Sequence, residues 1–386
     1  MTRRSVVVIL LALATGAAIQ GWILWLERGT QVAERSRPVP SDAVSRFRER
    51  LLAEAQIEVE PLESMAAGRA ARFAIEERLD AVATRLDSEA LDWRPVFGEL
   101  ARRHPATEPE VLELYRVELA AAERFVLEHD MVPLPAEHLT VEAVDNPMLR
   151  RTFPLALYLE PARLGVVLRP PRAPGPVPGY LANHCAICVP PLAVHEGYPG
   201  HHVAYSLARE SRAGEERGVG SAGRANMTFH EGWGQYAELL MLEAGYWAAA
   251  PERELGALRL ILLRALRAEV DGALVAGRLD AAGAEALYVE TLRMTRGAAR
   301  AEVAGHRQDP GRKSSYLVGA LQILALRAAL ERAPGDVSRR QLHRVLLEHP
   351  APIPAIARER FGVELPPRLP PVDLLPLSAE TGEVPR

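Results

Sequence analysis

The spacing of apolar and polar residues predicts a mainly helical chain. Over residues 41–130, apolar positions recur every three or four residues with charged residues between them, as in ESMAAGRAARFAIEERLDAVATRL. This is the period of amphipathic helices. Thr107 stands where an N-cap is expected, ahead of another such run. Helix is predicted again from His195 to about Leu347, interrupted by the Gly-rich stretch RAGEERGVGSAGRAN.

The period changes between residues 133 and 178. HLTVEAV and LALYLEPARLGVVLRPP are short β-rich runs bounded by prolines, which predict two or three strands. The tail over residues 364–386 is rich in proline and acidic residues and has little to bury, so we expect it to be disordered. The predicted fold class is therefore mainly α, with a small β-sheet (α+β).

Residues 1–27 are predicted to be a membrane anchor. Arg3 and Arg4 precede an uncharged run over residues 5–26, which at ~1.5 Å per residue spans roughly 33 Å and can cross a hydrocarbon core. No convincing A-x-A-like cleavage site is present, so an uncleaved single-pass anchor is favoured over a signal peptide. The two arginines then stay in the cytoplasm, and the rest of the chain lies outside it, in the periplasm of a Gram-negative cell. Residues 28–40 are a polar linker.

The composition adds little to this picture. The chain has 386 residues, 48% hydrophobic and 25% charged, with a net charge of -4, which is typical of a globular protein and gives no reason to expect nucleic-acid binding. Lys313 is the only lysine, which we interpret as a bias of genome composition. We expect a helical N-terminal region over residues 41–130 and a catalytic region over residues 131–363.

Cys185 and Cys188 form a C-x-x-C pair, CAIC. Outside the cytoplasm such a pair can be a disulfide or a redox motif. A structural zinc site with His184 is another alternative, although thiolate ligands persist poorly where cysteines are oxidised. The flanking sequence lacks the strand–helix context of thioredoxin-like proteins. We therefore favour two buried apolar residues in the wall before the helix that carries His195.

The segment HEGYPGHH, which begins at His195, concentrates residues that bind zinc. In a regular helix, two histidines chelate a metal when they lie four residues apart on one face. Here His201 and His202 follow at six and seven residues, so neither pair can chelate from an unbroken helix. Pro199 and Gly200 interrupt the helix. A local bulge at YPG would return His201 to the metal.

A second segment, FHEGWGQYAELLMLEAG, supplies a carboxylate. It is predicted to be helical and places Glu231, Gln235 and Glu238 along one face. A carboxylate from a later helix completes a His-His-Glu zinc site, and Glu196 would act as general base on a water activated by zinc. A solvated cluster of surface residues is the alternative, but the concentration of ligand types favours a metal site.

The chain resembles the bacterial family called domain of unknown function 885, which is grouped with gluzincin-type metallopeptidases. HEGYPGHH and EGWGQYAE carry the resemblance, with weaker matches at RAEVDGAL and DPGRKSSYLVGALQI, in the order and spacing of the family over roughly residues 130–335. The resemblance implies a gluzincin-like helical metallopeptidase fold with a small sheet beside the active-site helices.

The resemblance also implies roles for individual residues. His195, His201 and Glu231 match the positions expected to bind one zinc ion per chain, and Glu196 matches the general base. Tyr316 is a candidate to hydrogen-bond the oxyanion of the tetrahedral intermediate. Further residues are expected to surround the ligands or face the substrate: His202, Tyr236, Glu238, Arg267 and Asp271.

Two places depart from the family pattern. Val275 stands where members usually carry a histidine, and Arg312 and Lys313 replace a Gln-Ala pair. Because the ligands and the base are intact, we expect a membrane-anchored, extracytoplasmic zinc metallohydrolase, a peptidase that acts on a peptide or another amide. The alternative is a catalytically silent, metal-containing binding or scaffold protein of the same fold, for which Val275 is the main support.

Overall fold

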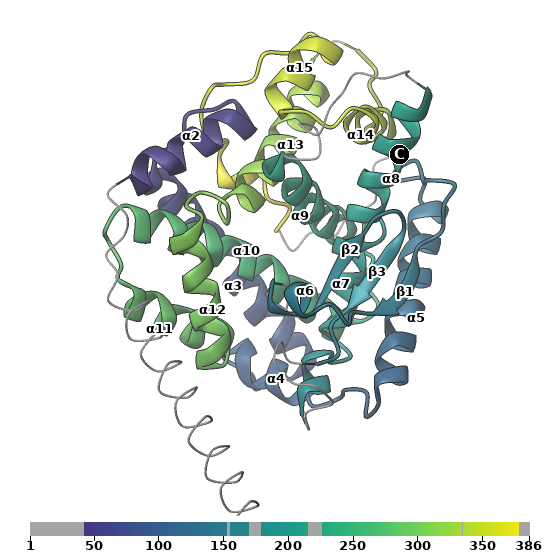
Figure 1. Cartoon of the computed structure of the whole chain (residues 1–386), viewed down its shortest axis with the longest axis vertical. Helices are drawn as coiled ribbons and strands as arrows, with labels where there is room; N and C mark the ends of the chain where they lie inside the picture. The colour runs from purple at the N-terminus through teal and green to yellow at the C-terminus, as the bar shows by residue number, and fades with distance from the viewer. Residues whose placement is uncertain (1–41, 153–154, 170–178, 215–225, 334, 378–386) are drawn as a thin grey trace, which may run out of the picture.

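Helices dominate the chain, and one small sheet packs beside them (Figure 1). The computed structural model describes residues 42–152, 155–169, 179–214, 226–333 and 335–377. Within these ranges the mainly α class with a small sheet is confirmed. The predicted anchor and linker lie outside the described residues. None of the helices in the described part of the chain combines the length and the apolar character that a membrane span requires.

The helical N-terminal region is present as predicted. It consists of α2 (Ala43–Ala55), α3 (Pro61–Leu86), α4 (Trp93–Leu100) and α5 (Glu108–Glu128). Thr107 caps α5, because its hydroxyl accepts a hydrogen bond from the backbone N–H of Glu110 while the Glu110 carboxylate accepts one from the backbone of Thr107. Two otherwise unpaired N–H groups are satisfied by this capping box.

The predicted strands form a three-stranded sheet. The elements of this region are β1 (Thr140–Ala143), α6 (Pro147–Thr152), β2 (Ala156–Leu159) and β3 (Arg163–Val166). The central strand β3 pairs parallel with β1 and antiparallel with β2, so that Leu164 lies opposite both Val141 and Tyr158. As an edge strand, β2 has a free side, and that side lies beside the helix that carries His195 (Figure 1).

The remaining helices include α9, which lies near the middle of the molecule (Figure 1). They are η1 (Tyr180–Asn183), α7 (Val189–Glu196), α8 (His201–Gly214), α9 (Met227–Glu243), α10 (Pro251–Val275), α11 (Ala281–Leu292), α12 (Arg296–Gln308), α13 (Ser315–Arg332), α14 (Arg339–Glu348), α15 (Ile353–Phe361) and η2 (Val372–Leu374). Nearly every residue of α9 is buried. Because a helix buried all round is normally apolar, its buried polar residues His230, Gln235 and Glu238 indicate a specific role.

Helix begins earlier than predicted at the first histidine. The expected start was His195, but α7 begins at Val189, with Pro190 and Pro191 in its first turn. Proline is tolerated there because the first N–H groups of a helix have no partner within the helix. The first ligand candidate therefore lies near the C-terminal end of a short helix rather than at its start.

The prediction of a disordered tail is wrong for residues 364–377. Leu375 is buried, and Arg78 on α3 donates to the carbonyl of Pro376 at 3.5 Å. Apolar side chains of this segment pack against the core: Leu365, Leu369, Val372, Leu374 and Leu377. The prolines do not prevent this packing, because an extended segment can dock without a regular ladder of its own. Residues 378–386 lie outside the described residues.

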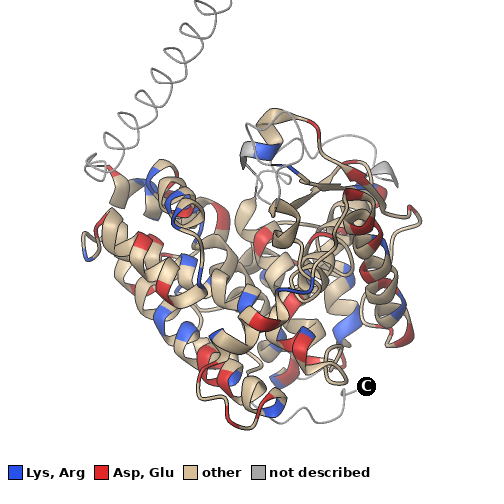
Figure 2. Cartoon of the chain, turned by 90° about the horizontal axis from the view of Figure 1, so that it is seen from below, with Lys and Arg blue, Asp and Glu red and all other residues tan. Residues whose placement is uncertain are grey.

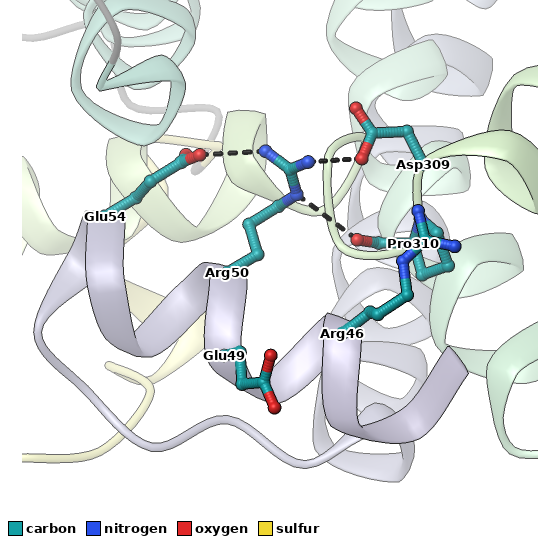
Figure 3. Close-up of a pocket in the computed structure, with 6 residues that line it drawn as sticks. All are labelled: Arg46, Glu49, Arg50, Glu54, Asp309 and Pro310. Carbon is teal, nitrogen blue, oxygen red and sulfur yellow. Dashed lines mark hydrogen bonds and ion pairs between the residues drawn. The ribbon is translucent and has the colours of Figure 1, made fainter. Parts of the chain in front are cut away.

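Helix α2 braces the start of α9. Arg50 on α2 pairs with Glu54 at 2.8 Å and with Asp309, and its Nε donates to a backbone carbonyl at 3.3 Å (Figure 3). The second carboxylate oxygen of Glu54 accepts hydrogen bonds from the N–H and the hydroxyl of Thr228, at 3.0 and 2.9 Å. These contacts fix the first turn of α9, directly before Glu231 in the second turn.

A polar pocket of about 350 Å³ lies at this junction (Figure 3). Its lining residues are Arg46, Glu49, Arg50, Glu54, Asp309 and Pro310. Arg50 reaches across the pocket to the two acidic groups on either side, so its charge is already neutralised within the protein. Over the molecule as a whole, acidic and basic residues are interspersed along the helices (Figure 2).

Candidate metal centre

Three helices bring His195, His201 and Glu231 together. His195 lies near the end of α7, His201 begins α8, and Glu231 lies in the second turn of α9. One ligand atom from each residue lies within 4.8 Å of the other two. Oε2 of Glu231 is 3.5 Å from Nε2 of His195 and 3.4 Å from Nε2 of His201. The structure thus assembles the three residues that the sequence predicted as ligands.

These separations fit a zinc ion. Ligand atoms at ~2.0–2.1 Å from a tetrahedral zinc lie about 3.3–3.4 Å from one another. Both His–Glu distances are longer than an ordinary hydrogen bond. In the part of the chain that the structure describes, the buried Oε2 of Glu231 has no hydrogen-bond partner. A buried carboxylate oxygen without a partner destabilises the folded protein, because its lost hydration is not replaced. A divalent cation bound by the three atoms would compensate that cost.

The YPG segment separates two helices instead of distorting one. α7 ends at Glu196 and α8 begins at His201, so the two histidines reach the same point from different helix ends. The carbonyl of Pro199 accepts a hydrogen bond from the indole N–H of Trp233 at 2.9 Å. At Gly200 an added Cβ would lie 1.9 Å from the carbonyl oxygen of His195. The six-residue spacing is therefore accommodated by a tight turn and not by the predicted bulge.

Two glycines of the EGWG motif let neighbouring groups approach α9. A Cβ on Gly234 would lie 2.5 Å from Cε1 of His195. A Cβ on Gly232 would lie 2.5 Å from Cα of Gly319 on α13, so these two helices touch through their backbones. The sequence reasoning missed both glycines. Two glycines within three residues of Glu231, on a predicted helix, could have indicated that other groups approach the helix closely there.

Glu238 fixes the orientation of the His195 ring. Its Oε1 lies 2.6 Å from Nδ1 of His195. Because an ionised carboxylate only accepts hydrogen bonds, Nδ1 carries the proton and Nε2 is left to face Glu231. Burial acts to lower the pKa of His195, but the nearby carboxylates of Glu231 and Glu238 outweigh this and raise the pKa to about 9. The raised pKa means that the ring also tends to carry a proton on Nε2. A metal ion must displace this proton to bind Nε2.

The charge of Glu231 is maintained by the two histidines. Burial acts to raise the pKa of this carboxyl, yet the nearby imidazoles of His195 and His201 hold the pKa well below the usual range. Glu231 is therefore ionised at neutral pH, as a metal ligand must be.

Glu196 is oriented by the sheet. Its Oε2 accepts a hydrogen bond from the backbone N–H of Tyr158 at 2.8 Å. Tyr158 belongs to the edge strand β2. The strand therefore fixes the carboxylate of Glu196, the candidate base, which follows His195 directly in the sequence. The small sheet thus contacts the end of α7, the helix that carries His195.

Tyr316 lies against His195. The centroids of the two rings are 6.3 Å apart, with an interplanar angle of 21°. The guanidinium groups of Arg264 and Arg267 lie 4.8 and 5.2 Å from the centroid of the Tyr316 ring. Burial, and after it the charge of Glu231, raises the pKa of Tyr316. Its hydroxyl is therefore protonated at neutral pH and can donate a hydrogen bond.

Two other predicted residues make their hydrogen bonds away from the ligands. His202 donates from Nε2 to the carbonyl of Glu137 at 3.0 Å, and its Nδ1 faces the hydroxyl of Ser206 at 3.3 Å. The side chain of His202 points away from the ligand cluster because it is rotated by about 100° around α8 from that of His201. The hydroxyl of Tyr236 lies 2.8 Å from Nε2 of His343 on α14. The Tyr236 contact joins α9 to α14, whereas the His202 contact ties α8 to the segment before β1.

Asp271 and Arg267 of the third motif are also committed to partners within the protein. Asp271 accepts hydrogen bonds from the hydroxyl of Ser314 at 2.9 Å and from Nδ1 of His306 at 3.1 Å. Arg267 forms a two-pronged pair with Glu302. Both side chains are thus held by partners within the protein, and Arg267 also lies over the Tyr316 ring.

A stack of rings beside the ligands escaped the sequence reasoning. Tyr205, one helical turn after His201, stacks on His230 at 4.3 Å and on Tyr158 at 5.4 Å, with interplanar angles of 9° and 8°. Its ring is 5.8 Å from that of His201. Burial, and then the charge of Glu231, raises the pKa of Tyr205. The spacing of four residues from His201 was the signal for it.

Cys185 and Cys188 form a disulfide. The expectation of two unlinked apolar residues is therefore wrong, and so is the zinc site built on their thiolates. The bond closes the turn before α7, whose N-cap residue is Cys188. His184 faces the hydroxyl of Tyr115 at 3.2 Å and the carbonyl of Val167 at 3.0 Å. Burial lowers its pKa to about 4.

The departures from the family pattern lie outside the ligand cluster. Val275 is buried in a hydrophobic cluster with Phe47, Leu51 and Val318. Lys313 pairs with Glu302 at 2.6 Å. Neither position contributes to the three-residue ligand set.

The described residues thus form a mainly helical protein with a His-His-Glu cluster whose two histidines are buried. The family described as "Bacterial protein of unknown function (DUF885)" matches residues 9–359, and the chain belongs to this family. A search of curated protein sequences gives no match.

Two solved structures share the fold. A predicted lipoprotein from Colwellia psychrerythraea matches with a TM-score of 0.71 and 19% identity, over 84% of this chain and 55% of that chain. A predicted lipoprotein of unknown function from Shewanella oneidensis matches with a TM-score of 0.69 and 17% identity, over 89% and 64%. The chain therefore spans between half and two thirds of the length of these structures.

Proposed function

We propose that the protein is a zinc metallohydrolase that cleaves peptide bonds. The observation that carries the proposal is the position of Oε2 of Glu231. This buried atom has no hydrogen-bond partner among the described residues and lies 3.4 and 3.5 Å from two imidazole nitrogens. A carboxylate that follows the first histidine directly, at Glu196, adds a base to the metal ligands.

Each residue has a role in this proposal. His195, His201 and Glu231 would hold one zinc ion per chain. When bound, zinc supplies a Lewis acid that polarises the scissile carbonyl and makes water more acidic. Glu196, held by the N–H of Tyr158, takes the proton of the attacking water and passes it to the leaving nitrogen. The hydroxyl of Tyr316 donates a hydrogen bond to the developing oxyanion.

The proposal includes a location outside the cytoplasm, at the membrane. The disulfide supports it, because such bonds persist in oxidising compartments. The uncharged run over residues 5–26 supports an anchor in the cytoplasmic membrane. The two structures of similar fold are both described as predicted lipoproteins, which agrees with a protein held at a membrane surface.

A peptide library tests the proposal. The full chain is loaded with one equivalent of zinc in detergent, and cleaved bonds are identified by mass spectrometry. We expect cleavage that stops with a chelator and returns with zinc. Glu196→Gln should lose at least ~10²-fold in turnover and keep its zinc. Glu210→Gln, which changes a carboxylate on α8 that accepts a bond from the backbone of Ala136, is the matched control. Equal turnover in wild type and Glu196→Gln would contradict the mechanism.

A metal-containing binding or scaffold protein of the same fold is the second candidate. Val275, where the family usually has a histidine, favours it, and in the structure this residue packs among apolar side chains. This alternative predicts stoichiometric zinc but no cleavage of any peptide by the zinc-loaded chain. The same library experiment therefore distinguishes the two candidates.

A further inference from the structure

We propose that Lys313, the only lysine in the chain, positions Tyr316 through a buried series of ion pairs. The series runs from Lys313 through Glu302 to Arg267, which lies over the Tyr316 ring. The inference rests on the proposed function, because Tyr316 is assigned there to the oxyanion. It explains one of the departures from the family pattern, the lysine in DPGRKSSY.

The ion pairs are close and largely removed from solvent. Nζ of Lys313 lies 2.6 Å from Oε2 of Glu302. Arg267 bonds the same carboxylate twice, from Nε at 3.0 Å and from Nη2 at 2.7 Å. The three side chains are only 12 to 17% exposed, so salt and water screen these pairs weakly. The two-pronged bond also fixes the plane of the guanidinium.

Arg267 transmits this constraint to Tyr316. Its guanidinium carbon is 5.2 Å from the ring centroid, within the range of a cation–π contact. Arg264 lies 4.8 Å from the same centroid, and the ring of His195 lies 6.3 Å away. The Tyr316 ring is therefore placed by two cations and by the ring of a metal ligand. Releasing Arg267 removes one of these contacts.

The surroundings of Lys313 are adapted to it. A Cβ on Gly305 of α12 would lie 2.8 Å from Cε of Lys313, so a glycine at this position leaves room for the lysine chain. Burial and the charge of Arg267 lower the pKa of Lys313 to about 8. Two cations thus share the single carboxylate of Glu302, whose pKa they hold well below its usual range although burial acts to raise it. Removing either cation changes how the carboxylate holds the other.

Fluorine NMR of the full chain labelled with 3-fluorotyrosine tests the positioning directly. Tyr316→Phe identifies the resonance of this residue among those of the tyrosines. We expect Lys313→Met to shift or split that resonance, and Glu302→Gln to do the same. Arg312→Met is the matched control, because this neighbouring arginine is 48% exposed and lies 3.6 Å from Asp309. An unchanged Tyr316 resonance in both Lys313→Met and Glu302→Gln would overturn the proposal.

Lys313→Gln, which keeps an N–H donor, replaces Lys313→Met if the latter fails to fold. In the folded variants kcat should fall ~10- to 100-fold, because small misplacements of catalytic groups have effects of this size. KM and zinc content should stay unchanged. A merely structural role would lower the melting temperature and leave both kcat and the resonance as in wild type, which would contradict the proposal. A wild-type chain without turnover would contradict the proposed function, whereas the fluorine measurement would still decide the positioning.

Discussion

Glu231 and Glu238 hold the two nitrogens of one imidazole ring. Oε2 of Glu231 lies 3.5 Å from Nε2 of His195, and Oε1 of Glu238 lies 2.6 Å from its Nδ1. Seven residues separate the two glutamates, which places them on the same face of α9, two turns apart. Glu231 is thus in position to bind the same metal ion as Nε2 of the ring. Glu238 fixes the orientation of the ring through Nδ1.

This arrangement predicts that Glu238→Gln weakens zinc binding. Loss of a carboxylate behind a metal-binding histidine typically costs ~10- to 100-fold in affinity, because the ring loses its orientation and some of its basicity. Competition with a chromophoric chelator measures the dissociation constant. Glu243→Gln is the control, since Glu243 lies on the same helix and pairs with Arg327 at 2.6 Å. Identical zinc affinities for Glu238→Gln and wild type would show that Glu238 has no such role.

Gly234→Ala should displace His195. The added Cβ would lie 2.5 Å from Cε1 of the ring, so we expect loss of zinc and a free energy of unfolding lower by about 1–3 kcal/mol. Gly297→Ala in α12 meets no atom within 4 Å and should be neutral or stabilising by up to ~1 kcal/mol. Urea unfolding and zinc analysis of the two variants give the comparison. A Gly234→Ala protein with full zinc content would disprove the proposed contact.

Tyr316→Phe should impair turnover without removing the metal. If the hydroxyl donates to the oxyanion, kcat should fall ~10²- to 10³-fold, while zinc content stays at the wild-type level. Tyr246→Phe is the control, because the Tyr246 ring packs against Phe125 and Trp247. Kinetics on a peptide found in the library provide the measurement. A wild-type kcat in Tyr316→Phe would remove this residue from the mechanism.

Stability should fall in mild acid because of buried histidines. Burial lowers the pKa of His343 to about 4 from 6.5, so below pH 6.5 the unfolded chain binds a proton that the folded chain does not. The free energy of unfolding therefore decreases as the pH falls from 6.5 to 4, by up to about 3 kcal/mol for this residue. His343→Phe should reduce the slope of stability against pH in urea titrations. An unchanged slope would contradict the assigned pKa.

Local patterns in the sequence predicted much of the fold. The strands follow from short β-rich runs between prolines, and the start of α5 follows from Thr107 and Glu110. The packing of the tail could not be predicted in this way, because it depends on distant apolar partners and not on the composition of the tail. The spacing of the two cysteines also left several chemistries open, and only their placement in three dimensions selects the disulfide.

The sequence predicted the candidate metal ligands but not the contacts that position them. The motifs indicated His195, His201, Glu231 and Glu196, and the structure brings the first three together. It also puts Tyr316 against His195. The contacts of Gly234 and Lys313 depend on how α9, α12 and α13 pack. A single sequence carries no direct record of such packing, which is why the sequence did not predict these contacts.

The most direct test of the central claim is the metal content of the full chain, purified without chelator, for wild type, Glu231→Ala and Glu196→Gln. We predict about one zinc ion per wild-type chain, as a three-residue site requires. The ion should be lost in Glu231→Ala, which removes a ligand, and kept in Glu196→Gln, which removes only the base. Wild-type protein without stoichiometric metal would contradict the account.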